Sequence, residues 1–117
     1  MARFEIFHKP RCGKSRQTLA RLTAAGITPA VVEYLTDPPS AKRLTEILKL
    51  LGFADPRALM RTKEPVYAEL GLAEVTDPKK LVAAMVAHPI LIERPIVIKD
   101  GKRAVLGRPP ENVDALL

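Results

Sequence analysis

The sequence is poor in cysteine. It contains one cysteine, Cys12, and two histidines, His8 and His88, which lie 80 positions apart. A single thiol cannot form an internal disulfide, and this set cannot build a cysteine-rich zinc site. Position 15 is a serine, so the Cys-x-x-Cys pair of dithiol oxidoreductases is missing as well. Any redox turnover at Cys12 therefore needs a second thiol from another molecule.

Aromatic residues and long apolar runs are also scarce. The sequence has no tryptophan, three phenylalanines and two tyrosines, and no basic stretch is interleaved with them, which argues against base stacking on nucleic acid. No apolar stretch approaches the roughly eighteen residues of a membrane helix, and the N-terminus does not resemble a signal peptide. Neither a glycine-rich phosphate loop nor a metal-ligand cluster is visible. We expect a cytoplasmic monomer that holds no metal and binds no nucleic acid and no membrane.

Basic residues outnumber acidic ones. The chain has 19 Lys and Arg against 13 Asp and Glu, a net charge of +6, which favours anionic partners such as a small oxyanion. Its 117 residues are 47% hydrophobic, enough to bury one core without a disulfide. We expect a single domain over residues 1–117.

The first third of the chain predicts a strand, a helix and a second strand. Residues 3–8 are rich in aromatic and β-branched residues and end at the breaker cluster Lys9–Gly13. A helix is expected from Lys14 to a stop at Gly26, and residues 30–35 are typical of a buried strand. Two strands joined by a helix indicate a βαβ unit with parallel strands.

The rest of the chain predicts helices and then a hairpin. The expected elements are helices at 40–51, 78–87 and 109–117, two short helical pieces around Glu64-Pro65, and two strands joined at Asp100-Gly101. The fold class is therefore α/β, a small mixed sheet (βαβ … ββα) flanked by helices, with a helical insertion between the two halves. This order resembles that of the thioredoxin-like fold.

Cys12 lies in the loop between the first strand and the first helix. The unpaired N–H groups of a helix start favour a thiolate, but the helix dipole contributes only about 0.3–1 kcal/mol. A cation about 4 Å away contributes roughly 4 kcal/mol at an effective dielectric of 20, which is about three pKa units. His8 and Arg16 are the most favourable of the nearby cations. This setting favours a reactive thiol over the alternative, a small buried cysteine without chemistry.

Other side chains could complete a site around Cys12. Ser15 stands where a side chain of the first helical turn reaches back to the cap, and it could donate to the thiolate. Thr18 occupies the place of the arginine that closes phosphatase-like loops, so charge for an oxyanion must come from arginines brought in by the fold. The candidates, each beside a proline or another breaker, are Arg61, Arg94 and Arg108. Each could instead be a surface charge, and the sequence leaves open whether the Arg94-Pro95 peptide is cis.

Six motifs, spread over nearly the whole chain, carry a resemblance to a known family. They are His8–Arg16, Tyr34-Leu35 with Pro38-Pro39, Arg57–Arg61, Glu69–Leu72, His88–Val97 and Gly107–Pro109. With these motifs the sequence resembles the glutaredoxin-coupled arsenate reductases, which have a thioredoxin-like fold. The resemblance implies that Cys12 attacks arsenate, that Arg61, Arg94 and Arg108 bind and stabilise the oxyanion, that His8 helps to lower the thiol pKa, and that Ser15 lies near the thiolate.

The resemblance also implies a reaction. Arsenate would be converted to arsenite through a Cys12 thiol-arsenate adduct, which glutathione and glutaredoxin resolve. Glutathione would be a co-substrate, and no cofactor would be bound. Two alternatives stay open: a non-enzymatic transcription regulator of the same fold that binds RNA polymerase, and a related glutathione-dependent thiol protein that acts on glutathione conjugates or on another oxyanion.

Overall fold

The computed structural model describes residues 2–117, which form two units. The first unit contains the residues up to Asp37 together with Arg94–Leu117, and the second contains Pro38–Glu93. The expected single domain over residues 1–117 stays a prediction.

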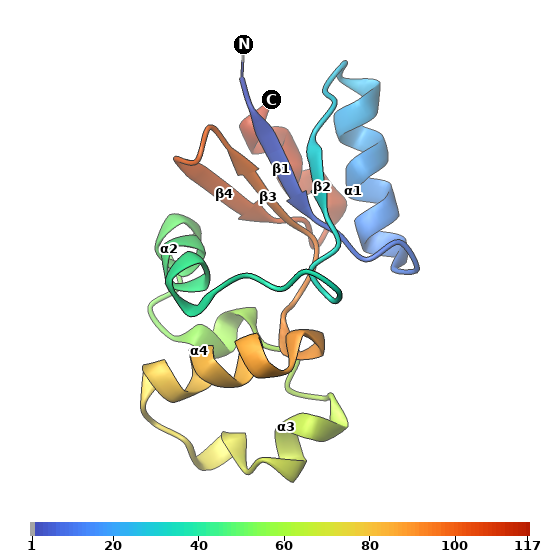
Figure 1. Ribbon diagram of the computed structural model, residues 1–117. Coiled ribbons are helices and arrows are strands. Elements are labelled where there is room, and N and C mark those ends of the chain that lie inside the picture. The colour runs from blue at the N-terminus through green and yellow to red at the C-terminus, as the bar shows by residue number, and fades with distance from the viewer. Residues whose placement is uncertain (1) are drawn as a thin grey trace. The chain divides into compact units, whose positions relative to one another are not determined.

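A four-stranded mixed sheet forms the centre of the first unit (Figure 1). Its strands are β1 (Phe4–Phe7), β2 (Ala30–Val32), β3 (Ile96–Lys99) and β4 (Arg103–Leu106), in the order β2-β1-β3-β4. Strand β1 runs parallel to β2 and antiparallel to β3, and β3 is antiparallel to β4. This arrangement confirms the predicted α/β fold class of the thioredoxin-like type.

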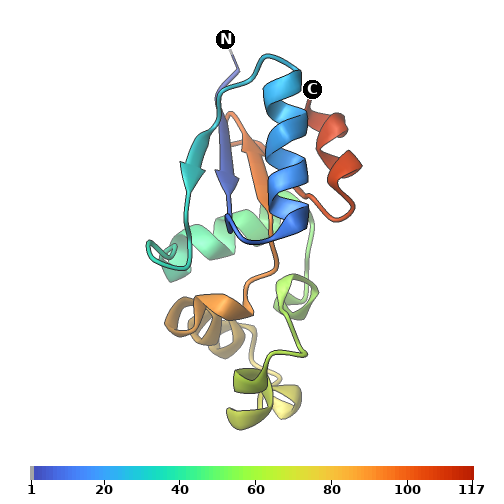
Figure 2. The same cartoon turned by 90° about the vertical axis from the view of Figure 1, so that its right-hand side faces the viewer.

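One face of this sheet is covered by α1 (Gly13–Ala24) and by a C-terminal 3-10 helix, Pro110–Leu116, which lie side by side in Figure 2. The predicted last helix is therefore present, in the tighter 3-10 form. The core between these layers contains the fully buried Ile6, Leu22 and Val97. Burial of apolar side chains from three distant segments holds the strands and helices of this unit together.

The second strand is shorter and more exposed than expected. Residues 30–35 were expected to form a buried strand, but β2 has three residues and Val31 is 49% exposed. As an edge strand it has a neighbour on one side only, so its apolar residues are not enclosed. Tyr34, which follows the strand, is fully buried. The expected length and burial of the strand were wrong, because the apolar composition does not reveal an edge position.

The hairpin between β3 and β4 turns at the predicted place. Asp100 and Gly101 have φ angles of 56° and 65°, the left-handed region that glycine and, less easily, aspartate adopt. The Arg94-Pro95 peptide, which precedes β3, is cis, and so is the Arg108-Pro109 peptide after β4. Pro95 lies just before the strand, where it removes no ladder hydrogen bond.

The second unit is helical. It contains α2 (Ala41–Leu51), α3 (Pro65–Glu69) and α4 (Pro78–Ala87), together with short 3-10 helices at Pro56–Leu59, Leu72–Glu74 and Pro89–Leu91. Ser40 caps α2 by accepting a hydrogen bond from the Arg43 N–H at 3.1 Å. The predicted helices at 40–51 and 78–87 and the two short pieces around Glu64-Pro65 are confirmed.

Arg57 ties the irregular part of this unit together. Its guanidinium donates to the Tyr67 hydroxyl at 3.2 Å, to the Leu72 carbonyl at 2.7 Å, and to the Val75 carbonyl. Hydrogen bonds to a charged donor are stronger than neutral ones, so one side chain fixes the loop after α3. Arg57 is therefore a structural residue of the second unit.

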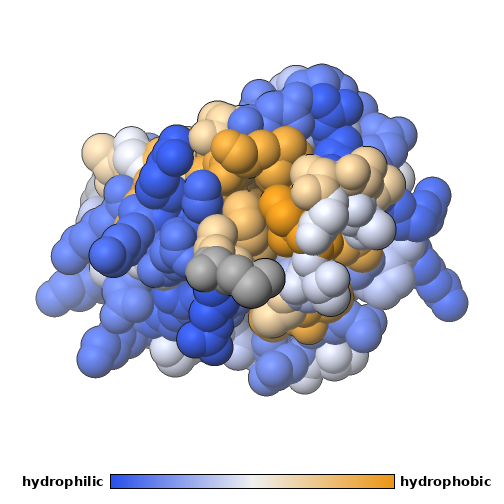
Figure 3. Space-filling model, turned by 90° about the horizontal axis from the view of Figure 1, so that it is seen from above, coloured by the Kyte–Doolittle hydropathy of each residue, from blue (hydrophilic) through white to orange (hydrophobic). Residues whose placement is uncertain are grey.

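The face of the molecule seen in Figure 3 is largely hydrophilic, with a hydrophobic area near its middle. Among residues 2–117, the exposed large hydrophobic residues are Val31, Leu35, Leu70, Ile90 and Leu117. Within residues 2–117, no helix is long and apolar enough to cross a membrane.

Candidate active site

Cys12 is the N-cap residue of α1, at the end of the loop that follows β1. Its backbone is extended, with φ −91° and ψ 123°, and its carbonyl accepts the first helical bond from the Arg16 N–H at 3.0 Å. The Cys12 N–H in turn donates to the Lys9 carbonyl at 3.0 Å. The thiol is partly exposed. A tight turn thus presents the sulfur at a helix start while leaving it open to a reactant.

The surroundings of Cys12 favour the thiolate. Burial by itself raises the pKa of the thiol, but the N–H of Ser15, the Arg94 guanidinium and the N–H of Lys14 donate to the sulfur and lower this pKa to about 7. A larger fraction of this thiol is therefore ionised at pH 7 than of an ordinary cysteine. The thiolate is both the nucleophile and the better acceptor for these donors.

The strand register brings Arg94 and Arg108 to Cys12. Phe7, the last residue of β1, is paired with Ile96, and Ile96 is paired with Leu106. Arg94 lies two residues before Ile96, and Arg108 lies two residues after Leu106. Both arginines and the loop to Cys12 therefore leave the sheet at the same edge. Because this edge is made of aligned strand ends, segments far apart in sequence meet there.

Both arginines are held in place at this edge. Arg94 is 5% exposed, and its guanidinium donates to the Cys12 sulfur. The Nη1 of Arg108 lies 4.0 Å from the Cys12 Sγ and donates to the Arg94 carbonyl at 3.1 Å. Two fixed cations therefore stand beside the thiol, and each guanidinium can grip two oxygens of an oxyanion at once.

Ser15 supports the Cys12 loop. It is fully buried, and its Oγ accepts a hydrogen bond from the Lys9 N–H at 3.2 Å. The donor from Ser15 to the sulfur is its backbone N–H. The predicted proximity of Ser15 to the thiolate thus rests on the backbone of the first helical turn, while its side chain fixes the preceding loop.

His8 and Arg16, the cations expected to activate the thiol, have other surroundings. His8 is 6% exposed, and burial lowers its pKa, with a further lowering by Arg16 and an opposing effect of Glu33. A neutral imidazole adds no positive charge to the site, in contrast to the expectation from sequence. Arg16 donates to the Pro10 carbonyl at 3.1 Å and so braces the loop. The cation that donates to the sulfur and lowers its pKa is Arg94.

Arg61 belongs to the second unit, after the 3-10 helix Pro56–Leu59. Its Nε donates to Glu64 Oε1 at 3.1 Å and its Nη1 to Glu93 Oε1 at 2.6 Å. Burial lowers the pKa of Arg61, but the two carboxylates raise it by more than burial lowers it. The net effect is a raised pKa, so the guanidinium stays charged. Arg61 is a cation clamped by two acids, and its part in oxyanion binding stays a prediction.

The chain resembles known proteins over nearly its whole length. Residues 7–116 match the model of the ArsC family. The chain belongs to the ArsC family. It is 48% identical to the arsenate reductase of Neisseria meningitidis serogroup B over 118 aligned residues, which cover all of both chains. It is 45% identical to that of Haemophilus influenzae over 113 residues, 96% of this chain and 97% of the relative.

A solved structure of the same size agrees with this assignment. The structure of an arsenate reductase from Vibrio cholerae matches this ArsC-family chain with a TM-score of 0.93 at 47% identity, covering 97% of each. The similarity in structure therefore extends over both units and includes the segments that carry the thiol and the arginines.

Two supporting contacts of this ArsC-family chain were missed in the sequence. The Arg61–Glu64 ion pair is one of them, although its spacing of three residues is that of a helical ion pair and is visible in the sequence. Gly107 was noted only within a motif, although a Cβ there would lie 2.6 Å from the Thr18 Oγ1. No sequence signal indicates that second contact, because the two residues are 89 positions apart.

The chemistry open to this site is nucleophilic. Among residues 2–117 no group of three or more potential metal ligands comes together. The site offers one activated thiol, two backbone donors and two guanidinium groups. Such a set can hold a tetrahedral oxyanion against the sulfur and stabilise the charge that develops on attack.

Proposed function

We propose that this chain is an arsenate reductase in which Cys12 is the nucleophile. The observation that carries the proposal is the Cys12 thiol, with a pKa of about 7, beside Arg94 and Arg108. The substrate is taken from the relatives, because arsenate reductase is the name of the Neisseria, Haemophilus and Vibrio proteins. An anionic substrate also agrees with the net charge of +6.

In the first step the thiolate attacks the arsenic atom of arsenate. A sulfur–arsenic bond forms and one arsenic–oxygen bond breaks, and the departing oxygen takes protons from arsenate and solvent and leaves as water. Arg94 and Arg108 offset the repulsion between the thiolate and the anion and hold the oxygens of the adduct. A well-aimed donor of this kind typically contributes about 3–4 kcal/mol of transition-state stabilisation.

The reduction needs two electrons from outside the chain, which has no second cysteine. Glutathione displaces a further arsenic-bound oxygen, and the thiolate of glutaredoxin then attacks the glutathione sulfur. A glutathione–glutaredoxin disulfide forms, and the electron pair of the broken sulfur–arsenic bond stays on arsenic, which becomes As(III). Hydrolysis of the remaining bond to Cys12 releases arsenite and restores the thiol. We place this reaction in the cytoplasm, with the enzyme as a monomer and no bound cofactor.

The deciding assay is arsenate-dependent NADPH oxidation with glutathione, glutaredoxin and glutathione reductase supplied. The proposal predicts turnover that disappears in Cys12→Ser and when either glutathione or glutaredoxin is left out. Phosphate in place of arsenate serves as the control for the oxyanion, and Lys102→Ser, in the β3–β4 turn, as the control variant. Turnover by Cys12→Ser would exclude the covalent route. No turnover by folded protein with a free thiol would exclude arsenate as the substrate.

A further inference from the structure

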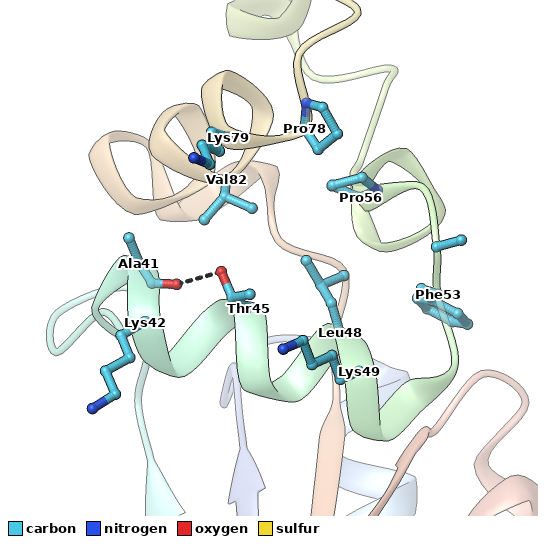
Figure 4. Close-up of a pocket in the computed structure, with 11 residues that line it drawn as sticks. Ala41, Lys42, Thr45, Leu48, Lys49, Phe53, Pro56, Pro78, Lys79 and Val82 are labelled. Carbon is cyan, nitrogen blue, oxygen red and sulfur yellow. Dashed lines mark hydrogen bonds between the residues drawn. The ribbon is translucent and has the colours of Figure 1, made fainter.

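The second unit contains a groove that the thiol chemistry does not use. It lies between α2, residues 53–56 and the start of α4, and it has a volume of about 520 Å³ (Figure 4). That size is within the range of about 300–1,000 Å³ that is typical of small-molecule sites. All eleven lining residues belong to the second unit, and none is a residue of the thiol site described above.

The floor of the groove is apolar. Leu48 of α2 and Val82 of α4 point into the space between the two helices, and Pro56 and Phe53 close one end (Figure 4). The only hydroxyl in the lining, that of Thr45, donates to the Ala41 carbonyl at 2.8 Å and is thereby engaged within α2. The floor therefore favours an apolar group over a polar one.

The charged part of the lining has one sign. It contains Lys42, Lys49 and Lys79 and no acidic residue. In the part of the chain that the structure describes, none of these three ammonium groups is in a salt bridge. These three lysines form the rim of the groove, and their positive charge is therefore available to an anion from outside.

The acidic residues next to the groove in sequence are already engaged. Asp55 accepts a hydrogen bond from the Arg57 N–H at 2.9 Å, and Asp77 caps α4 by accepting from the Lys79 N–H at 3.0 Å. Glu46 lies 3.8 Å from the Arg43 guanidinium. Asp55 and Glu46 therefore have arginine partners of their own, and among the described residues none of these carboxylates is in a salt bridge with a lysine of the groove.

From the apolar floor and the lysine rim we infer that the groove binds a small amphiphilic carboxylate, with an apolar body and one anionic head. An inorganic anion would leave the floor in contact with water, and a neutral hydrocarbon would leave the lysines without a counter-charge. The two features together select a ligand that has both parts. This inference does not depend on arsenate reduction.

The probe is octanoate, added to the full-length protein and followed by amide chemical shifts in NMR. Shifts should saturate and map to α2, residues 53–56 and the start of α4. Octanol and octyltrimethylammonium, with the same chain and a neutral or positive head, should bind at least tenfold more weakly. From hexanoate to octanoate each added methylene should raise affinity by up to about fourfold, as expected for a buried methylene.

Variants separate the groove from general surface charge. Lys49→Glu and Lys79→Glu should each weaken octanoate binding several-fold, whereas the matched Lys102→Glu in the β3–β4 turn should leave it unchanged. Thr45→Tyr, at an exposed helical position, should fill the groove and abolish binding while the helix signals persist. Equal binding of octanol, an equal effect of Lys102→Glu, or shifts outside the groove would overturn the inference. Binding of an acidic peptide but not of octanoate would also overturn it, because the occupant would then be a protein segment.

Discussion

Replacing Gly107 by alanine tests the packing that places Arg108 beside the thiol. A Cβ at position 107 would lie 2.6 Å from the Thr18 Oγ1 and 2.8 Å from the Pro95 Cγ, closer than real contacts allow. Thr18 is fully buried on α1, and its hydroxyl donates to the Lys14 carbonyl at 2.8 Å, so it cannot swing away without losing that bond. The segment that follows β4 and the helix α1 must therefore move apart.

The cost follows from the overpacking of a filled core. Inserting one methyl group into such a site typically destabilises a protein by about 1–3 kcal/mol. Urea unfolding of Gly107→Ala should show a loss of this size, with an unchanged slope. Because Arg108 is the next residue, its 4.0 Å approach to the Cys12 Sγ should lengthen, and we expect weaker oxyanion binding.

Two further variants make the reasoning refutable. Thr18→Ala removes two of the three close contacts, at 2.6 and 3.0 Å, so the double variant with Gly107→Ala should recover part of the lost stability. Gly13→Ala is the matched control, because a Cβ there meets nothing within 4 Å. If Gly107→Ala is as stable as the parent, or if Thr18→Ala brings no recovery, close packing at Gly107 is not what positions Arg108.

Three further outcomes can be measured. The rate of alkylation of Cys12 should rise with pH through a midpoint near 7, and Arg94→Ala should move that midpoint upward, since Arg94 lowers the thiol pKa. Arg94→Lys should bring the midpoint part of the way back. An unmoved midpoint in Arg94→Ala would contradict this role. Ser40→Ala should lower the free energy of unfolding by about 1 kcal/mol, read from urea denaturation, because the cap of α2 is lost. Arg57→Met should cost about 2 kcal/mol in thermal or urea unfolding, because partly buried carbonyls lose a charged donor. A cost as small as that of an exposed lysine variant would refute the bracing role.

Several elements could be predicted because their signals are local. Ser40 starts α2, Pro78 is the first residue of α4, and Asp100-Gly101 turns the hairpin, each at the expected position. Caps and turns depend on the backbone preferences of one or two residues, which the sequence states directly. The reactive setting of Cys12 was predictable for the same reason, since a helix start follows it in the chain.

Other features could not be predicted because they depend on distant neighbours. The exposure of Val31 comes from its edge position, and the lowered pKa of His8 comes chiefly from its burial. His8 is close to Cys12 in sequence, which suggested a cation, yet burial disfavours the charged imidazole. Proximity along the chain was thus a poor guide to charge at the sulfur.

The sequence by itself determined the order of the elements, the single thiol and its place at a helix start, because these follow from composition and short-range backbone preferences. Only the tertiary structure decided which cations reach that thiol. The register of β1, β3 and β4 aligns Phe7, Ile96 and Leu106 and thereby brings Arg94 and Arg108 to the sulfur. The reason is physical: electrostatic and hydrogen-bond energies depend on distances in space, which hydrogen-bonded strand pairing sets between segments that are remote in the chain.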